Sequence, residues 1–529
     1  MRSETNSDLK FILILSAIVM LIISLPYLYL YFQTPTGAVY FWTSMLNPAD
    51  MPVYFSYIEQ TKQGHLLFSD LYTSEPHQPF LNIFLLAVGL TAKFFNLSAP
   101  IIFHLTRLTL IPFFIWTLKK IIDFFEPHWH PRLLLVLITF TTGFGLLLAP
   151  LMSRENIFQV GAGLDLLAAE ATPFMSMFYS GHFILSWLAL LWSIIFTIKS
   201  YQKQSCLYAV AAGIINLFFF QFHPYYAPLI FIFSLTILLY ALFKKKLKNI
   251  WFFLLQMTIP LPSIIYYFYL FFTDERASIF LSQNYLPSPA WWVTLFSFGF
   301  LGPLAIGGLA ILTIKKQWSE KYLFLFFWLT ATALLLYSPL RSQRRFIEGM
   351  FIPIFFFALV PFKTAFVQRY LNARHTACLI VVIILFLFSS QTTFTILYLH
   401  YLSPKQWPQA IYFDKSIIQA AQWLKNETTA RDIIMAATDN GNIIPSISGR
   451  RVFAGHLGET LFFDLKKTVI SDFFRNQKDN KRIDFLANHK ISLIFWSKEE
   501  KALGNFQPEI KKYLQKIYDK DWVQIYRVL

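Results

Sequence analysis

Acidic and basic side chains stand between long apolar blocks of this sequence, where charged groups are costly unless they are paired or take part in function. The carboxylates there are Asp50, Glu59, Asp70, Glu75, Glu155, Asp165, Glu170, Asp274, Glu275 and Glu348. A compact basic group consists of Arg341, Arg344 and Arg345. Carboxylates can accept the proton of a reacting hydroxyl, and guanidinium groups bind phosphate with two parallel hydrogen bonds. These residues are therefore functional candidates.

The composition indicates a membrane protein, because 56% of the 529 residues are hydrophobic and only 14% are charged, whereas soluble domains carry about 25% charged residues. The apolar blocks are roughly 17 to 23 residues long, which suits an α-helix that crosses a hydrocarbon core about 30 Å thick. About eleven spans are expected on this basis. They are 11–31, 101–118, 132–150, 182–198, 206–222, 229–243, 250–272, 293–314, 322–338, 351–362 and 376–398. The first block lacks a cleavage site, so it predicts an uncleaved span.

Lysine and arginine placement predicts the orientation, because cytoplasmic loops carry an excess of positive charge. The basic connectors are 119–120, 199–203, 244–248, 315–321 and 363–374. All of them share the side of the N-terminus if the apolar stretch 79–95 lies in the interface without spanning. We therefore expect a multi-pass protein of the cytoplasmic membrane with its N-terminus inside. The loop 32–100, the arginines and everything after about residue 402 then lie outside.

The first outside loop has the richest pattern. Asp50 is followed by Pro52, and then by aromatic and apolar residues at helical spacing up to Gly64. This pattern predicts that Asp50 is the N-cap of a short amphipathic surface helix. A capping role and a chemical role for Asp50 are compatible. Tyr54 in this helix and Glu75 farther along the loop are candidate substrate contacts.

This layout resembles that of the GT-C glycosyltransferases, which are membrane enzymes that use polyprenyl-phosphate sugars, typified by protein mannosyltransferases and aminoarabinose transferase. In that family the first outside loop begins with an aspartate just past the first span. It then runs through a tyrosine-containing surface helix that ends in glycine, and continues into a second surface helix. Residues 47–100 match this layout in order and spacing. The resemblance implies a GT-C fold, and for Asp50 the role of general base or acid-coordinating group at the acceptor.

The resemblance also implies a second carboxylate in a later outside loop, and Asp165 or Glu170 could fill that place. The family's usual Arg-Pro-Asp-like signature is absent, so the choice between the two stays open. His182 and His223 stand at span boundaries, where each could contact a phosphate or simply be an interfacial polar tip.

Arg341, Arg344 and Arg345 lie outside, against the positive-inside trend, and are a candidate clamp for the donor phosphate. They could equally hold lipid headgroups or pair with acidic residues. The sequence has no glycine fingerprint for nucleotides and no Cys/His cluster with zinc spacing. No cofactor is therefore predicted with certainty, and a divalent metal stays open.

The composition changes after Tyr398, and residues 402–529 are rich in charged residues. We expect residues 1–400 to form the transmembrane GT-C-like domain and 402–529 to form a small soluble α/β domain outside. The pattern predicts helices at 415–425, 462–474 and 481–488, and strands at 432–437, 451–454, 491–496 and 522–528. The segments 444–451 and 455–460 could contact substrate or serve only as turns.

The predicted function is a membrane glycosyltransferase, hexosyl or pentosyl, that moves a sugar from a polyprenyl-phosphate donor to an acceptor outside. Asp50 would be the base, Asp165 or Glu170 a helper, and the three arginines the phosphate clamp. The alternatives are a transporter or flippase for a lipid-linked precursor, or a non-catalytic membrane protein. The net charge of +16 does not predict nucleic-acid binding, since much of it is an orientation signal. The sequence does not predict the oligomeric state.

Overall fold

The computed structural model describes residues 2–45, 48–126, 129–145, 163–363, 375–406, 411–475 and 478–529. The chain divides into two compact units. The first, here called the helical unit, contains Met1–Leu25, His104–Tyr267 and Tyr285–Leu399. The second, called the mixed unit, contains Pro26–Phe103, Phe268–Asn284 and His400–Leu529. The boundary falls inside four helices, α1 (Arg2–Phe32), α4 (Ala99–Phe125), α14 (Leu261–Thr273) and α22 (Gln391–Gln406).

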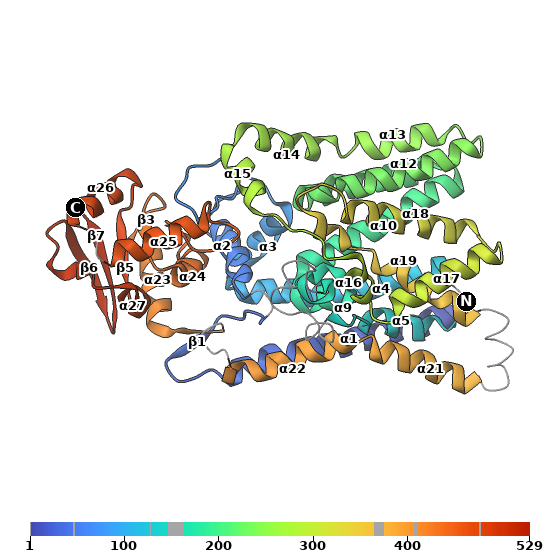
Figure 1. Ribbon diagram of the computed structural model, residues 1–529, viewed down its shortest axis with the longest axis horizontal. Coiled ribbons are helices and arrows are strands. Elements are labelled where there is room, and N and C mark those ends of the chain that lie inside the picture. Colours follow the sequence, from blue (N-terminus) through green and yellow to red (C-terminus); the bar gives the residue numbers. More distant parts are fainter. Residues whose placement is uncertain are drawn as a thin grey trace. The chain divides into compact units, whose positions relative to one another are not determined.

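The helical unit consists of apolar helices with short connections (Figure 1). Its longer helices are α5 (Pro131–Phe140), α10 (Gly181–Lys203), α11 (Cys206–Phe222), α12 (Ala227–Phe243), α13 (Asn249–Thr258), α17 (Leu301–Ile314), α18 (Glu320–Leu336), α19 (Phe351–Lys363) and α21 (His375–Phe388). Helix α10 packs against α11, α12 against α18, and α17 against α19. Gly308 permits the last contact, because a Cβ there would overlap the carbonyl group of Phe357.

Short elements connect these helices and carry several of the candidate residues. They are α8 (Leu164–Leu167), η2 (Ala169–Ala171), α9 (Pro173–Tyr179), η3 (Pro224–Tyr226), α16 (Trp291–Phe296) and η4 (Gln343–Ile347). The 3₁₀ turns η2 and η4 pack against each other, and η4 packs against α18. The acidic η2 and the arginine-bearing η4 are therefore neighbours within the helical unit.

Each predicted span overlaps a helix or a pair of helices in the described residues. Four helices are long and apolar enough to cross a membrane, or up to six if each bent pair forms one span. The four are Asn6–Phe32, Ala99–Phe125, Gly181–Lys203 and Pro224–Phe243. The count of about eleven crossings stays a prediction. Residues 146–150 of one predicted span, Glu155 and the connector 364–374 lie outside the described residues.

The mixed unit contains a five-stranded sheet in the order β4-β3-β5-β7-β6. The strands are β3 (Ile433–Met435), β4 (Arg451–Val452), β5 (Leu493–Trp496), β6 (Leu514–Lys520) and β7 (Val523–Val528). Strand β3 pairs in parallel with β4 and β5, whereas β7 is antiparallel to β5 and β6. A separate two-stranded sheet pairs β1 (Ala38–Tyr40) with β2 (Tyr412–Asp414).

Helices cover both faces of the five-stranded sheet. They are α23 (Lys415–Glu427), α24 (Thr438–Ser448), α25 (Phe463–Phe474), α26 (Asp479–Asn488) and α27 (Lys498–Leu503), coloured orange to red in Figure 1. Alternate residues of β5 enter different cores, because successive strand side chains point to opposite faces. Leu493 and Phe495 pack with Leu424 of α23, whereas Ile494 and Trp496 pack with the phenylalanines of α25.

The predicted helices and strands of the C-terminal segment lie close to α23, α25, α26, β3, β4, β5 and β7. The elements that were not predicted include β2, α24, α27 and β6. Helix α24 contains Gly441 and Pro445, which both disfavour helix, but most of it is buried and it packs against α2 (Asp50–Lys62) and α23. Strand β6 is rich in charged residues and mostly exposed, so it carries no hydrophobic signal. The domain boundary near residue 401 stays a prediction.

Candidate active site

Asp50 is the first residue of α2, which lies in the mixed unit. The N-cap is Ala49, and no side chain caps the helix. The prediction that Asp50 caps the helix is therefore wrong, since its side chain turns to another partner. A negative charge in the first turn is still favourable to the helix dipole. The predicted end of the helix is confirmed, because α2 ends at Lys62 and Gly64 has a φ of +102°.

The sequence predicted that α2 is an amphipathic surface helix, and this prediction is wrong. Its residues from Met51 to Thr61 are all buried except Tyr54, because α3 (Ile83–Phe94) and α24 pack against it. The half-buried Tyr54 stacks on Phe103, with ring centroids 5.7 Å apart and planes at 17°. Asp50 is therefore the first residue of a helix whose other residues are firmly packed.

The Asp50 carboxylate is held by His456. His456 Nε2 lies 2.9 Å from Asp50 Oδ1, and the side chain of Asp50 is 39% exposed, against 11% for His456. Asp50 Oδ2 has no hydrogen bond among the described residues. Burial lowers the pKa of His456, but the hydrogen bond to Asp50 and the charges of Glu459 and Asp50 outweigh it and raise that pKa above its ordinary value. One oxygen of a half-exposed carboxylate is thus fixed while the other is left open.

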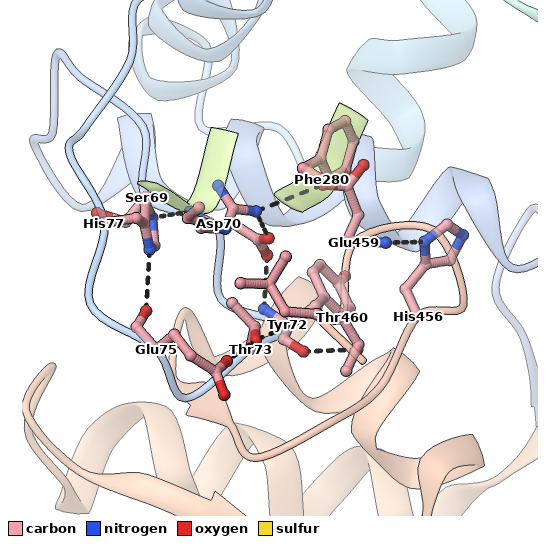
Figure 2. Close-up of polar contacts among 12 residues, drawn as sticks. Ser69, Asp70, Tyr72, Thr73, Glu75, His77, Phe280, His456, Glu459 and Thr460 are labelled. Carbon is pink, nitrogen blue, oxygen red and sulfur yellow. Dashed lines mark hydrogen bonds and ion pairs between the residues drawn. The ribbon is translucent and has the colours of Figure 1, made fainter. Parts of the chain in front are cut away.

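The turn that carries His456 lies beside a buried ion pair (Figure 2). Arg276, in α15 (Glu275–Gln283), pairs with Asp70 and lies 3.9 Å from the carboxylate of Glu459. Asp70 is fully buried and also accepts a hydrogen bond from the Tyr72 amide at 2.7 Å. Burial lowers the pKa of Arg276. These contacts hold the loop that follows α2, and also α15, against the turn.

Glu75 lies in the same loop and pairs with Lys466 of α25 at 2.6 Å. It also accepts a hydrogen bond from Thr73. Burial raises the pKa of Glu75, but the charge and hydrogen bonds of Lys466 outweigh burial and lower it below the ordinary value. The pKa of Lys466 is lowered as well, because burial of the ammonium group dominates there. Glu75 is thus engaged by a cation of the chain itself.

In the helical unit, Arg345 lies over the ring of Tyr225, with its guanidinium carbon 5.0 Å from the ring centroid. This is a cation–π contact. The hydroxyl of Tyr226 donates to the Arg345 carbonyl at 2.9 Å. Arg345 is also close enough to act electrostatically on His182 and His223. Three residues singled out in the sequence therefore meet around η3 and η4.

A buried hydrogen-bonded chain supports this group. Ser186 donates to Glu348 Oε2 at 2.9 Å, and the Nδ1 atom of His223 lies 2.8 Å from the Ser186 hydroxyl. The ring of His182 is 5.4 Å from that of His223, and its Nδ1 lies 2.7 Å from the Ser180 hydroxyl. Glu348 is fully buried, and burial raises its pKa well above the ordinary value.

Glu170 belongs to this group and Asp165 does not. Glu170 lies in η2 and acts electrostatically on Tyr225, Tyr226 and Glu348. Asp165 is fully buried, and its Oδ2 accepts hydrogen bonds from the Gly145 amide at 2.9 Å and from Thr392 at 2.5 Å. Burial raises the pKa of Asp165 to about 6.

Arg341 and Arg344 flank the group. Arg341 is exposed and accepts a backbone hydrogen bond from Leu286 at 2.9 Å, while the Arg344 amide donates to the Leu286 carbonyl at 3.1 Å. These bonds fix the backbone of the arginine segment. Glu170, His182, His223 and Arg345 thus meet in the helical unit, whereas Asp50, Tyr54 and Glu75 lie in the mixed unit.

Within the residues that the structure describes, no three His, Cys, Asp or Glu side chains group as a metal ligand set. Asp50 has a histidine Nε2 on one oxygen, and Asp165 already accepts two hydrogen bonds on Oδ2. No step below runs through a divalent ion.

Sequence reasoning missed four side chains that contact the acidic candidates, namely His456, Arg276, Lys466 and Ser186. His456 and Glu459 stood in a segment that was noted for its polar groups, so a signal existed for that turn. Arg276 and Lys466 look like ordinary surface charges, and their partners are 206 and 391 residues away. Ser186 lies inside an apolar block, where a single serine carries no signal.

The chain has the fold of a known membrane glycosyltransferase. The Archaeoglobus fulgidus oligosaccharyltransferase, tethered to an acceptor peptide containing the NVT sequon, matches with a TM-score of 0.53 and 13% identity over 91% of this chain and 69% of that one. The same enzyme, AglB, in complex with an inhibitory peptide and a dolichol-phosphate, matches with a TM-score of 0.53 and 12% identity over the same shares.

The mycobacterial arabinofuranosyltransferase AftD matches with a TM-score of 0.47 and 12% identity, over 98% of this chain and 40% of that one. No family model matches the sequence, and no curated protein does. The likeness to AglB confirms, at the level of the fold, the resemblance to GT-C glycosyltransferases that the first outside loop indicated.

Proposed function

We propose that this protein is a membrane glycosyltransferase that moves a sugar from a polyprenyl-phosphate donor to an acceptor on the outer side of the cytoplasmic membrane. The observation that carries the proposal is the presentation of Asp50. In a GT-C fold, a half-exposed carboxylate stands at the start of a packed helix with one oxygen held and the other open. This is the arrangement that a general base needs.

The proposed step is a displacement at the anomeric carbon. The acceptor oxygen forms a bond to that carbon, the bond from the carbon to the phosphate oxygen breaks, and polyprenyl phosphate leaves with the electron pair. Asp50 Oδ2 accepts the acceptor proton as the new bond forms. A positioned base contributes about 10²- to 10⁴-fold to such a step.

Arg345 is the proposed partner of the departing phosphate. Its guanidinium is positioned by the Tyr225 ring and by the hydrogen bond from Tyr226 to its own carbonyl. A fixed guanidinium stabilises the negative charge that grows on the leaving oxygen. Arg341 and Arg344 lie in the same segment and complete the proposed clamp, and His182 and His223 line it.

Glu170 is the second carboxylate of the proposal, because it shares the group with Arg345 and Glu348. Asp165 is assigned to support of the fold, since glycines enclose it and two donors occupy its Oδ2. The structural relative AglB binds dolichol-phosphate, which supports a lipid-linked donor for this chain.

The test is turnover by the purified full chain in lipid vesicles. A panel of polyprenyl-phosphate sugars, radiolabelled in the sugar, is supplied with a membrane extract as the acceptor source. The proposal expects loss of label from the donor, appearance of label in an acceptor, and release of free polyprenyl phosphate. Movement of intact donors between leaflets without release would instead identify a flippase, and would overturn the proposal.

A further inference from the structure

The segment Gly455–Thr460 forms a tightly held turn in the mixed unit. The Thr460 hydroxyl donates to the Tyr72 carbonyl at 2.7 Å and accepts from the Gly455 amide at 3.0 Å. The side chains of Gln283 and Asn284 donate to the Thr460 and Gly458 carbonyls at 2.9 and 3.0 Å. Hydrogen bonds at both ends of the turn therefore fix the backbone from which His456 projects.

The two ring nitrogens of His456 have different partners. The Gly458 and Glu459 amides both donate to Nδ1, at 3.2 and 3.1 Å. Figure 2 shows the second of these bonds. A nitrogen that accepts hydrogen bonds carries no proton, so in the neutral ring the proton must be on Nε2. Nε2 faces Asp50 Oδ1 at 2.9 Å. In the charged ring both nitrogens are protonated, so Nε2 still donates to Asp50, but the two amide bonds to Nδ1 belong to the neutral ring.

Other groups around the ring do not compete for this bond. The Tyr72 ring lies edge-on at 6.2 Å, and the Glu459 carboxylate is close enough to Arg276 for an ion pair at 3.9 Å. Asp50 is the side chain to which Nε2 is hydrogen-bonded. The backbone of one turn thus determines which nitrogen donates and where the proton points.

We propose that His456 is a positioning residue for Asp50, whose Nε2 proton fixes Oδ1 so that Oδ2 faces the acceptor. This inference rests on the proposed function for its catalytic meaning and on the turn geometry for its structural meaning. Through His456, the turn contacts the start of α2. The C-terminal segment therefore contributes to the proposed site a side chain that is 406 residues from Asp50 in the sequence.

Two substitutions test the roles of the two ring nitrogens separately. In His456→Asn the amide oxygen takes the place of Nδ1 and keeps the bonds within the turn, but nothing reaches Asp50. In His456→Gln the amide nitrogen takes the place of Nε2 and donates to Asp50, while the turn loses its acceptor. A hydrogen bond to a charged group is worth roughly 10- to 100-fold in a rate. H456N should lose this much in kcat with little change in donor KM, and H456Q should restore most of it.

The opposite result would overturn the inference. If H456Q were the impaired variant and H456N active, the ring would serve only the turn. Equal activity of the two variants, at any level, would also exclude a specific role for Nε2. Thermal unfolding of both proteins measures what each loses in stability, so that rates are compared per folded molecule.

A second measurement does not depend on turnover. Nitrogen NMR of the full chain labelled in its 11 histidine rings reports which nitrogen is protonated, and H456N assigns the signals of His456. We expect a protonated Nε2 whose shift changes in Asp50→Asn, and an unprotonated Nδ1 at high pH. A proton on Nδ1 of the neutral ring at high pH would overturn the inference even in an active enzyme. An inactive wild type with the expected NMR signals would instead count against the proposed function alone.

Discussion

Asp50 and Asp165 are both acidic residues near the start of a short helix, yet their carboxylates have opposite surroundings. Asp50 is 39% exposed, and among the described residues its carboxylate is hydrogen-bonded to a histidine side chain. Asp165 is fully buried and accepts from a backbone amide and from Thr392. Added Cβ atoms at Gly143, Gly145 and Gly163 would all lie within 3 Å of its oxygens, at 2.8, 2.3 and 2.7 Å.

This difference supports the proposed roles, in which Asp50 takes part in chemistry and Asp165 supports the fold. Glycines let the backbone close around Asp165, so no substrate atom can reach it without a rearrangement. The Asp50 carboxylate is held at Oδ1 by the side chain of His456, and Oδ2 is left open. The sequence predicted the same kind of role for both residues, because the residue type and the helix start are alike.

The largest effect should come from Asp50→Asn. Asparagine keeps the size of the side chain but cannot accept the acceptor proton, so sugar transfer should fall by about 10²- to 10⁴-fold. The measurement is release of polyprenyl phosphate by the variant in vesicles. Asp464→Asn is the matched control, since Asp464 is an exposed aspartate in the first turn of α25. Full transfer by D50N would remove Asp50 from the role of base.

Much of the architecture was predictable and most of the site was not. Apolar blocks locate the helices because burial in a membrane leaves a long, local signal. The segment that opens at Asp50 was predictable as a helix, but its burial was not, because that depends on α3 and α24. The partner of Asp50 is 406 residues away in the chain. Nothing local in the sequence links two residues at such a distance.

In the helical unit, too, the candidate residues were predictable from their types, but their positions in space were not. Glu170, His182, His223 and Arg345 were each chosen for their residue type, and their convergence was not predictable from spacing. The packing of η2 against η4 brings them together. Asp165 was an equal alternative to Glu170, and only the glycines around it separate the two. Close approach of backbone segments that are distant in the chain cannot be predicted from a single sequence.

Arg345→Gln should have the next largest effect. Glutamine cannot supply the positive charge that the departing phosphate needs, and loss of one charge-assisted bond lowers a rate by roughly 10- to 100-fold. Donor titrations in vesicles check this, with Arg431→Gln, a change at an exposed arginine of the mixed unit, as the control. Wild-type kinetics in R345Q would assign the phosphate site to other residues.

Gly145→Ala should reduce stability without acting on the chemistry. The added Cβ would lie 2.3 Å from Asp165 Oδ1, and overpacking of this kind costs about 1–3 kcal/mol. Fluorescence-monitored thermal unfolding should show a lower Tm than for Gly307→Ala, where the nearest atom is 4.0 Å from the new Cβ. Equal Tm values for the two variants would mean that Asp165 is not closely enclosed.

The smallest expected effect is a pH dependence of stability that is due to the buried carboxyl group of Asp165. Burial raises the pKa of Asp165 from 3.8 to about 6 in the folded protein. The folded state therefore binds more protons than the unfolded state between these values, and stability must fall as pH rises through this window. The slope is at most about 1.4 kcal/mol per pH unit for one group.

Asp165→Asn removes this titration while its amide oxygen can still accept from Gly145 and Thr392. The difference in Tm between D165N and the wild type should therefore grow in favour of the variant from pH 4 to pH 6, and then level off. Asp464→Asn, at an exposed aspartate, is the matched control. If D165N followed the wild type across the whole range, the pKa of Asp165 would be the same in the folded and unfolded protein, and its enclosure would not distinguish it from Asp50.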